Sequence, residues 1–535
     1  MAMIDESTRL MTKTQKTRIQ IMDTTLRDGE QTPDISYTAS EKLHVTRLLL
    51  ADVGIDRIEI ASARVSHGEL EATLRITDWA REAGMIERIE VLGFCDGQRS
   101  VDWILQAGGS VMNLLTKGSE HHCRIHLQMT PKEHIQRIVE TVNYSLQNDV
   151  LVNVYLEDWS NGVRDNFEYV SNIMNTIQGL DVERVYLADT LGILAPDDVH
   201  HFVGVMAITW PEVKFEFHGH NDYGLATANA IAAIQAGACG VHVSVNGLGE
   251  RAGNASLAEV VATIADHTNF TTGVKESRLA VISNLIETFS GKNISANAPI
   301  LGNDVFTQTA GVHADGDAKG DLYATLLAPQ RFGRERRYAL GKLSGKASLN
   351  HNLKRLGITL SDENRQKVLD RIIELGDKKH VVVPEDLLML IADVLKTPAE
   401  QIFQIDNYTI NVTSNGPPKA TVIVSFQGRT EKASGTGNGG YDAFMHALQK
   451  AIVQYGIEIP QLVDYRVRIP PGGRTEALVE TLISWSYNTE DRSFSTIGVD
   501  SDQTTAAIIA TEKMLNIIAH QDGRERTSND PKHQN

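Results

Sequence analysis

Short apolar segments alternate with longer amphipathic stretches over the first half of the chain. The apolar segments are rich in strand-forming residues and fall at 19–23, 57–61, 89–94, 111–115, 151–156, 184–188, 214–218 and 241–245. The stretches between them carry apolar residues at helical spacing, for example at 40–53, 66–83, 132–147 and 223–237. Strands that alternate with helices predict right-handed βαβ units around a parallel sheet.

Eight such units within about 250 residues have the number and size of a (β/α)8 barrel, the TIM barrel. The alternative is a doubly wound open sheet, which commonly carries Gly-x-Gly-x-x-Gly after its first strand. No such motif follows residues 19–23. We therefore predict an α/β chain whose residues 18–290 form a TIM barrel.

The alternation ends after the barrel. Residues 301–330 are rich in Gly and Asp and have few periodic apolar positions, so we expect a long functional loop there. Residues 361–375 and 384–396 have the spacing of two amphipathic helices. Residues 291–402 are thus expected to form a linker and a small helical subdomain.

Residues 403–518 are expected to form a separate α/β domain. A strand at 419–425 leads to a Gly-rich turn and a helix within 435–452, and a strand at 477–486 leads to a turn and a helix within 498–516. The two halves resemble a diverged internal repeat. Because neither half carries a metal or nucleophile constellation, we expect a binding or assembly module.

Composition narrows the partners of this 535-residue chain. A net charge of −17 argues against nucleic acid and against an anionic membrane. No apolar run is long enough to span a bilayer, and the first residues have no secretion signal. Three cysteines without metal or redox spacing suit free thiols in a cytoplasmic protein. The polar ends, 1–17 and 519–535, are predicted to be disordered.

The candidate chemistry begins at the seventh predicted strand, which ends in His218-Gly219-His220. Strand residues two apart face the same side, so both imidazoles point together. A lone His-x-His is weak evidence for a metal, because surface and core histidines are common. Asp28 follows the first strand, and the carboxyl ends of barrel strands meet at one mouth. Two imidazoles and one carboxylate with open positions would hold a divalent ion.

Further polar residues follow other strands, and helix capping is the bland explanation for some of them. Capping accounts for Thr190 and Asp158 but poorly for Arg27-Asp28, because caps do not require arginine. A 2-oxo acid would chelate the ion, and Arg27 would stabilise the alkoxide that develops. Glu157 is placed for general-base work or for orienting a water. A structural ion pair at the barrel mouth is the alternative role for Arg27.

Three motifs carry a resemblance. Residues 23–31 (DTTLRDGEQ), 218–222 (HGHND) and 246–254 (NGLGERAGN) are similar to the family of 2-isopropylmalate, homocitrate and citramalate synthases. The likeness covers residues 18–518, and the C-terminal repeat resembles the allosteric domain of that family. The resemblance implies enolisation of acetyl-CoA, attack on a 2-oxo acid and hydrolysis of the thioester.

The resemblance also implies roles for individual residues. The expected metal ligands are Asp28, His218, His220 and Asn254. The expected oxo-acid contacts are Arg27 and Thr190. The expected catalytic residues are Arg27, Glu157, His313 and Tyr323, the last two supplied by the long loop across a dimer. The expected effector contacts are Tyr441, Asp442 and Thr475.

The identity of the oxo acid depends on the fourth and fifth strands. The chain has Tyr155-Leu156-Glu157-Asp158 where 2-isopropylmalate synthases typically have a Ser-Ala-Glu-Asp-like segment, and Leu115-Thr116-Lys117 where they have Ala-Thr-Ser. Tyr155, Leu115 and Leu92 would make the pocket small and apolar, as in the citramalate synthases, which take pyruvate. The alternative is that these side chains are barrel packing and that a branched substrate still enters.

Pyruvate and the isoleucine pathway are therefore expected, and 2-oxoisovalerate with the leucine pathway is the alternative. Related carbon–carbon lyases share the barrel motifs but lack the C-terminal repeat, and an amino-acid sensor would leave the metal cluster idle. We expect a homodimer with Mn²⁺ or Mg²⁺, although Zn²⁺ or Co²⁺ also suits two imidazoles and a carboxylate. Isoleucine is the expected feedback effector, or leucine if the substrate is branched.

Overall fold

The computed structural model describes most of the chain. The described residues are 16–309, 316, 322, 325–356, 358–377, 382, 384–387, 390–391, 394, 402–426, 428–468, 479–486 and 493–528. The chain divides into two compact units, Met1–Phe306 with Ala324–Arg336, and Thr307–Tyr323 with Arg337–Asn535. None of the described helices is both long and apolar enough to cross a membrane.

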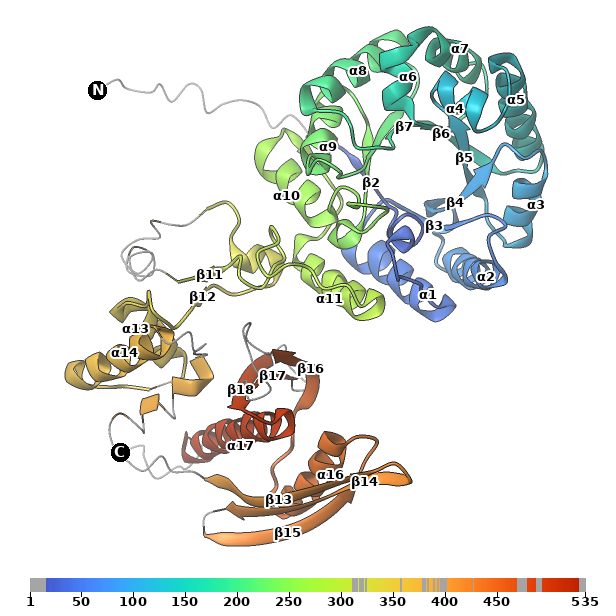
Figure 1. Ribbon diagram of the computed structural model, residues 1–535. Helices are drawn as coiled ribbons and strands as arrows, with labels where there is room; N and C mark the ends of the chain where they lie inside the picture. The colour runs from blue at the N-terminus through green and yellow to red at the C-terminus, as the bar shows by residue number, and fades with distance from the viewer. Residues whose placement is uncertain are drawn as a thin grey trace, which may run out of the picture. The chain divides into compact units, whose positions relative to one another are not determined.

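The first unit is built on a closed barrel of eight parallel strands (Figure 1). The strands are β2 (Gln20–Asp23), β3 (Arg57–Ser62), β4 (Ile89–Phe94), β5 (Val111–Lys117), β6 (Leu151–Glu157), β7 (Arg184–Asp189), β8 (Phe215–Gly219) and β9 (Gly240–Val243). Strand β2 pairs with β9 and closes the barrel. The predicted TIM barrel is thus confirmed, and each predicted strand overlaps an observed one.

Helices surround the barrel. They include α1 (Ala39–Arg47), α2 (His67–Glu82), α3 (Arg99–Gln106), α5 (Pro131–Gln147), α7 (Phe167–Ile177), α8 (Pro196–Thr209), α9 (Ala226–Gln235), α10 (Leu257–His267) and α11 (Leu279–Ser290). Capping residues in the sequence determine where some of these helices begin. Thr38 and Thr130 each form a capping box with a glutamate three residues on. Two short helices that the periodicity did not predict, α4 (Glu120–Ile125) and α6 (Trp159–Asp165), follow strands β5 and β6.

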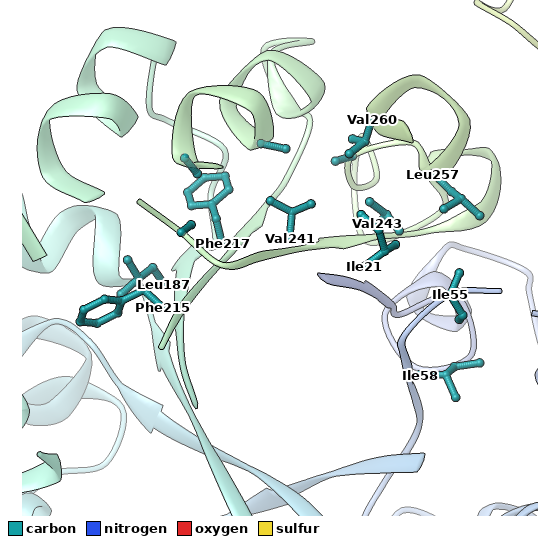
Figure 2. Close-up of a cluster of buried hydrophobic side chains, with 14 of the residues drawn as sticks. Ile21, Ile55, Ile58, Leu187, Phe215, Phe217, Val241, Val243, Leu257 and Val260 are labelled. Carbon is teal, nitrogen blue, oxygen red and sulfur yellow. The ribbon is translucent and has the colours of Figure 1, made fainter. Parts of the chain in front are cut away.

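Strand alternation separates the apolar core from the barrel interior. Phe215, Phe217, Val241 and Val243 point outward into the layer between strands and helices (Figure 2). Each fully buried side chain of this kind contributes roughly 1.5–3 kcal/mol to the free energy of unfolding. The residues between them, such as His242, face into the barrel.

The amino ends of the strands are tied together by buried charge. Arg57 donates to Glu90 at 2.6 Å and to both oxygens of Glu216 at 2.5 and 2.6 Å, and Tyr186 donates to Glu90 at 3.0 Å. All four side chains are buried. An unpaired buried charge here would lower the free energy of unfolding by several kcal/mol, so the charges need their partners. The network fills the end of the barrel opposite the mouth.

The second unit contains a helical part and a repeated α/β part. The helices α13 (Lys346–Arg355) and α14 (Asp362–Asp377) pack in one apolar cluster. The range 384–396 lies partly outside the described residues, and its first turn is the 3-10 helix Pro384–Asp386. Two short parallel strands, β11 (Thr307–Gln308) and β12 (Arg337–Tyr338), precede the helices.

The repeat expected in the C-terminal part is confirmed. One copy has β13 (Phe403–Thr413), β14 (Gly416–Phe426), β15 (Arg429–Thr436) and α16 (Gly440–Ile452). The other has β16 (Gln461–Arg468), β17 (Val479–Ser486), β18 (Ser493–Asp500) and α17 (Gln503–Ser528). Each copy is an antiparallel three-stranded sheet with one helix. Helix α17 runs to Ser528, so the residues just beyond 518, expected in the tail, continue the helix.

Candidate metal centre and active site

Three predicted metal ligands meet at the mouth of the barrel. The Asp28 Oδ2 atom lies 3.3 Å from His218 Nε2 and 3.8 Å from His220 Nε2, and the two Nε2 atoms are 3.4 Å apart. A point equidistant from three atoms at these separations lies about 2.0 Å from each, which is a typical ligand distance for Zn²⁺ or Mg²⁺. The three side chains are buried, and they come from the ends of β2 and β8, which lie on either side of β9 in the closed barrel.

Unsatisfied acceptors mark the same place. Asp28 Oδ1 and Asn254 Oδ1 are buried and have no hydrogen-bond partner among the described residues. Both side chains flank Gly249, where an added Cβ would lie 2.3 Å from Asn254 Nδ2 and 3.2 Å from Asp28 Oδ1. Buried acceptors without a partner are costly unless a cation or water completes them. The donor set therefore fits a divalent ion, with Asn254 beside it.

The protonation of these ligands suits metal binding. Burial alone would raise the pKa of Asp28, but Arg27 and the two imidazoles hold it well below its usual range. Burial, with His218 next to it, lowers the pKa of His220 to about 4. At neutral pH the site thus offers a carboxylate and a neutral imidazole lone pair, which are the forms that coordinate.

Arg27 is held beside the cluster from three sides. Its Nε donates to Glu59 Oε2 at 2.5 Å, its Nη1 to Asp28 Oδ2 at 3.1 Å, and its Nη2 to the Tyr155 hydroxyl at 3.5 Å. Burial alone would lower the pKa of Arg27, but the carboxylates of Glu59 and Asp28 hold it above its usual value. Arg27 therefore forms the ion pairs of the structural alternative, and these pairs also hold its guanidinium beside Asp28.

The residues expected to narrow the pocket lie together. Tyr155 and Leu92 belong to one buried apolar cluster inside the barrel with Met22 and Tyr186, and Leu115 packs against it. The neighbouring strands pair Leu115 with Tyr155 in register. These side chains are separate from the outer core between strands and helices, so they line the barrel interior.

Glu157 and Thr190 also lie at strand ends, with structural partners. Glu157 forms an ion pair with Lys117, the residue level with it on the adjacent strand. The Thr190 hydroxyl accepts from the backbone N–H of Asp158 at 2.8 Å, and Arg251 donates to the Thr190 carbonyl at 2.7 Å. The hydroxyl of Thr190 thus supports the loop after β6, whereas the helix that follows β7 is capped at Ala195 and not at Thr190.

Family models match three parts of the chain. Residues 18–286 match the HMGL-like family, 300–380 the homocitrate synthase post-HMGL domain-like family, and 381–519 the LeuA allosteric (dimerisation) domain.

The (R)-citramalate synthase CimA of Methanocaldococcus jannaschii is 32% identical over 88% of this chain and 94% of its own. A protein of Methanopyrus kandleri named "Probable 2-isopropylmalate synthase" is 32% identical over 94% of this chain and 98% of its own. The chain belongs to the HMGL-like family of citramalate and 2-isopropylmalate synthases. This confirms the resemblance seen in the three motifs.

Among solved structures, an HMG-CoA lyase of Acinetobacter baumannii in complex with coenzyme A and 3-methylmalate is similar, with 21% identity and a TM-score of 0.46. That match covers 53% of this chain and 94% of the lyase.

Members of the synthase family depend on a metal ion and use acetyl-CoA as co-substrate, and the LeuA dimerisation domain indicates an oligomer.

The remaining expected site residues of this synthase lie in the second unit. Tyr441 and Asp442 begin helix α16, where the Tyr441 hydroxyl bonds Thr511 at 2.6 Å and the Asp442 carboxylate accepts from Asn438 N–H at 2.8 Å. Three further expected residues lie outside the described part of the chain: His313, Tyr323 and Thr475.

Sequence reasoning missed several polar residues inside the barrel. Glu59 holds Arg27, Lys117 pairs with Glu157, and His242 contacts Tyr155. Glu59 and His242 interrupt apolar runs and Lys117 ends its strand, and in a barrel such residues face the interior or the mouth. That interruption is a pattern that could have identified them.

Proposed function

We propose that this synthase condenses acetyl-CoA with pyruvate to give citramalate and CoA, the entry to isoleucine synthesis. The observation that carries the proposal is the apolar cluster of Leu92, Leu115 and Tyr155 next to Arg27. We expect three large side chains at this place to favour a methyl group over an isopropyl group. The sequence likeness to an (R)-citramalate synthase supports the same substrate.

The proposed ligands of the ion are Asp28, His218, His220 and Asn254. When bound, the ion would act as a Lewis acid that polarises the keto group of the oxo acid. We propose Mn²⁺ or Mg²⁺, while two imidazoles and a carboxylate also suit Zn²⁺ or Co²⁺. The unpaired oxygens of Asp28 and Asn254 support this assignment.

Arg27 is proposed to bind the oxo acid and to neutralise the charge that grows on its keto oxygen during attack. Its three hydrogen bonds fix the guanidinium before substrate arrives, so little reorganisation is needed. Glu157 is proposed to act as the base or to orient the hydrolytic water, with Lys117 holding its carboxylate at the mouth. Thr190 is proposed as a further oxo-acid contact, and His313 and Tyr323 as catalytic residues.

The second candidate is 2-isopropylmalate synthesis from 2-oxoisovalerate, which the relative in Methanopyrus kandleri favours. The two oxo acids differ by two methyl groups. Each group that a pocket accepts or excludes is worth about 1–3 kcal/mol, so the selectivity should exceed tenfold in either direction.

The deciding experiment measures CoA release from acetyl-CoA with Mn²⁺ or Mg²⁺ and pyruvate, 2-oxobutyrate, 2-oxoisovalerate or 2-oxoglutarate. Pyruvate should have the highest kcat/KM, and a preference for 2-oxoisovalerate would replace the proposal by its alternative. Leu115→Ala should shift the ratio at least tenfold toward 2-oxoisovalerate. Leu114→Ala is the matched control, because Leu114 faces the outer core of the same strand and should leave the ratio unchanged.

Isoleucine is proposed to inhibit through the C-terminal repeat, with Tyr441, Asp442 and Thr475 as contacts. Two tyrosines form matched contacts with threonines of helix α17. The Tyr441 and Thr511 hydroxyls are 2.6 Å apart, and the Tyr408 and Thr505 hydroxyls are 2.7 Å apart. Tyr441→Phe should raise the inhibitory concentration of isoleucine, and Tyr408→Phe should not. Equal responses of the two variants, or inhibition by leucine alone, would contradict this assignment.

We further propose a cytoplasmic homodimer in which His313 and Tyr323 act in the partner's barrel, and the domain division 18–290, 291–402 and 403–518. Mixing His313→Ala and Asp28→Asn chains tests the shared site. Activity that returns only in the mixture supports sharing, and two inactive parents with an inactive mixture would refute it.

A further inference from the structure

A buried histidine contacts the proposed oxo-acid site from inside the barrel. His242 lies in the middle of strand β9 and is 1% exposed. Its Nδ1 is 3.0 Å from the Tyr155 hydroxyl, and its Nε2 is 3.3 Å from Glu216 Oε2. No residue role assigned above uses this imidazole, although it lies one hydrogen bond from Tyr155 and two from Arg27.

The partners of the ring determine which nitrogen carries the proton. Arg57 donates to both oxygens of Glu216, which therefore remains a carboxylate and can only accept. Although burial alone would raise it, Arg57 and His242 lower the pKa of Glu216 to about 2. His242 must then donate from Nε2, and the second hydrogen bond of the ring joins Nδ1 to a hydroxyl, which can donate to an unprotonated nitrogen. Nδ1 is left with a lone pair.

The direction of the Tyr155 hydroxyl follows from this tautomer. Nδ1 accepts, so the hydroxyl proton of Tyr155 points to His242. The hydroxyl oxygen then presents lone pairs to Arg27 Nη2 at 3.5 Å. The hydrogen bonds run in one direction, from Arg27 to Tyr155, from Tyr155 to His242, and from His242 to Glu216.

Aromatic contacts keep the ring in this orientation. Tyr186 meets His242 edge-on at 4.4 Å between ring centroids and 83° between planes, and Tyr155 meets it at 5.5 Å and 83°. Both tyrosines are buried, so the imidazole cannot rotate without displacing them. A ring flip would place carbon atoms opposite both Tyr155 and Glu216, so both hydrogen bonds of the ring would be lost.

We infer that His242 is a positioning residue, which fixes the Tyr155 hydroxyl as an acceptor for Arg27 and thereby sets how the oxo acid is held. The kinetic consequence of this inference rests on the proposed function. The direction of the hydrogen bonds does not depend on it. With its proton committed to His242, Tyr155 cannot donate to a substrate oxygen, so the polar end of the oxo acid is left to Arg27 and the other proposed contacts. The face of Tyr155 then meets its alkyl end.

Two substitutions separate the two ends of the ring. The amide of His242→Asn falls near the place of Nδ1 and keeps an acceptor for Tyr155, while that of His242→Gln falls near Nε2 and keeps only the link to Glu216. The KM for the oxo acid should rise at least tenfold in H242Q and less than threefold in H242N, with the KM for acetyl-CoA unchanged in both. Equal KM values for the oxo acid in H242Q and wild type would overturn the inference.

A Tyr155→Phe background tests whether the effect passes through the hydroxyl. Because Phe has no proton to direct, adding H242Q to Y155F should change the oxo-acid KM less than twofold. A tenfold change in that background would mean that His242 acts by another route, and the inference would fail. Thermal unfolding of each variant within a few degrees of wild type shows that folding is not the cause.

The tautomer itself gives a readout independent of catalysis. In protein labelled with ¹⁵N-histidine, the His242 resonances are those that H242N lacks. They should show a protonated Nε2 and an unprotonated Nδ1 at neutral pH, and the opposite tautomer would overturn the inference. If wild type releases no CoA with any oxo acid, the proposed function fails, and the tautomer still decides for or against His242.

Discussion

Replacing Glu59 by glutamine tests whether Arg27 is held in place by buried charge. Glu59 is fully buried, accepts from Arg27 Nε at 2.5 Å and accepts from Asn113 Nδ2 at 2.8 Å. Glutamine keeps the shape and one acceptor oxygen but removes the charge. Burial raises the pKa of Glu59, and the guanidinium beside it works against that rise. The carboxylate is thus stable only because Arg27 is next to it.

The expected loss follows from these contacts. A hydrogen bond between charged groups contributes about 1.5–3 kcal/mol, and complete loss of one partner of a buried pair costs about 3–5 kcal/mol. Because glutamine preserves an acceptor and Arg27 still has Asp28, we expect about 1.5–3 kcal/mol less free energy of unfolding. If nearly all of that energy orients Arg27 in the transition state, kcat/KM for the oxo acid falls roughly 10- to 100-fold.

The assay is urea unfolding together with kcat/KM for each substrate. The KM for acetyl-CoA should not change, because none of the contacts of Glu59 involves the thioester site proposed at Glu157. Glu90→Gln is the matched control, since Glu90 is equally buried on the adjacent strand but pairs with Arg57. It should lose similar stability and keep kcat/KM for the oxo acid within threefold. Equal losses of kcat/KM in both variants would refute the reasoning.

Three further changes test the site and its surroundings. Asp28→Asn should weaken Mn²⁺ binding, measured by calorimetry, while isoleucine still binds. The loss should exceed the roughly 10- to 100-fold that removal of a residue behind a metal ligand costs. Unchanged Mn²⁺ affinity would contradict the metal site. Gly249→Ala should also weaken Mn²⁺ binding because its Cβ would lie 2.3 Å from Asn254 Nδ2, whereas Gly204→Ala, with no atom within 4 Å, should not; equal affinities would refute this. Burial lowers the pKa of His134 to about 4, so its neutral form stabilises the fold fully above pH 6.5 and that contribution is lost as pH falls toward 4. Relative to His134→Gln, the wild type should therefore lose roughly 2–3 kcal/mol of unfolding free energy between pH 7 and 4, and parallel pH profiles would contradict the prediction.

The C-terminal repeat shows how far periodicity reaches. Strands at 419–425 and 477–486 and the helices after them were predictable, because alternation and helical spacing are local properties of the chain. The partner strands β13 and β16 do not show a clear alternation of buried and exposed residues. Their pairing was therefore found only in the three-dimensional sheets. The length of α17 was also missed, because its final turns are polar.

The barrel, the order of its strands and the meeting of Asp28, His218 and His220 could all be predicted from the sequence alone. Each depends on short-range information: a period of two brings His218 and His220 to one face, and the strand-end position of Asp28 brings it to the same mouth. The motifs around them were sufficient to recognise the family.

The contacts that hold and orient these groups become known from the three-dimensional fold. Glu59 reaches Arg27 from 32 positions away, and His242 reaches Tyr155 from 87. Such contacts depend on the register of neighbouring strands and on closure of the barrel, which no local period encodes. A polar residue within an apolar strand can be recognised in the sequence as one that needs a partner. The fold determines which partner it contacts.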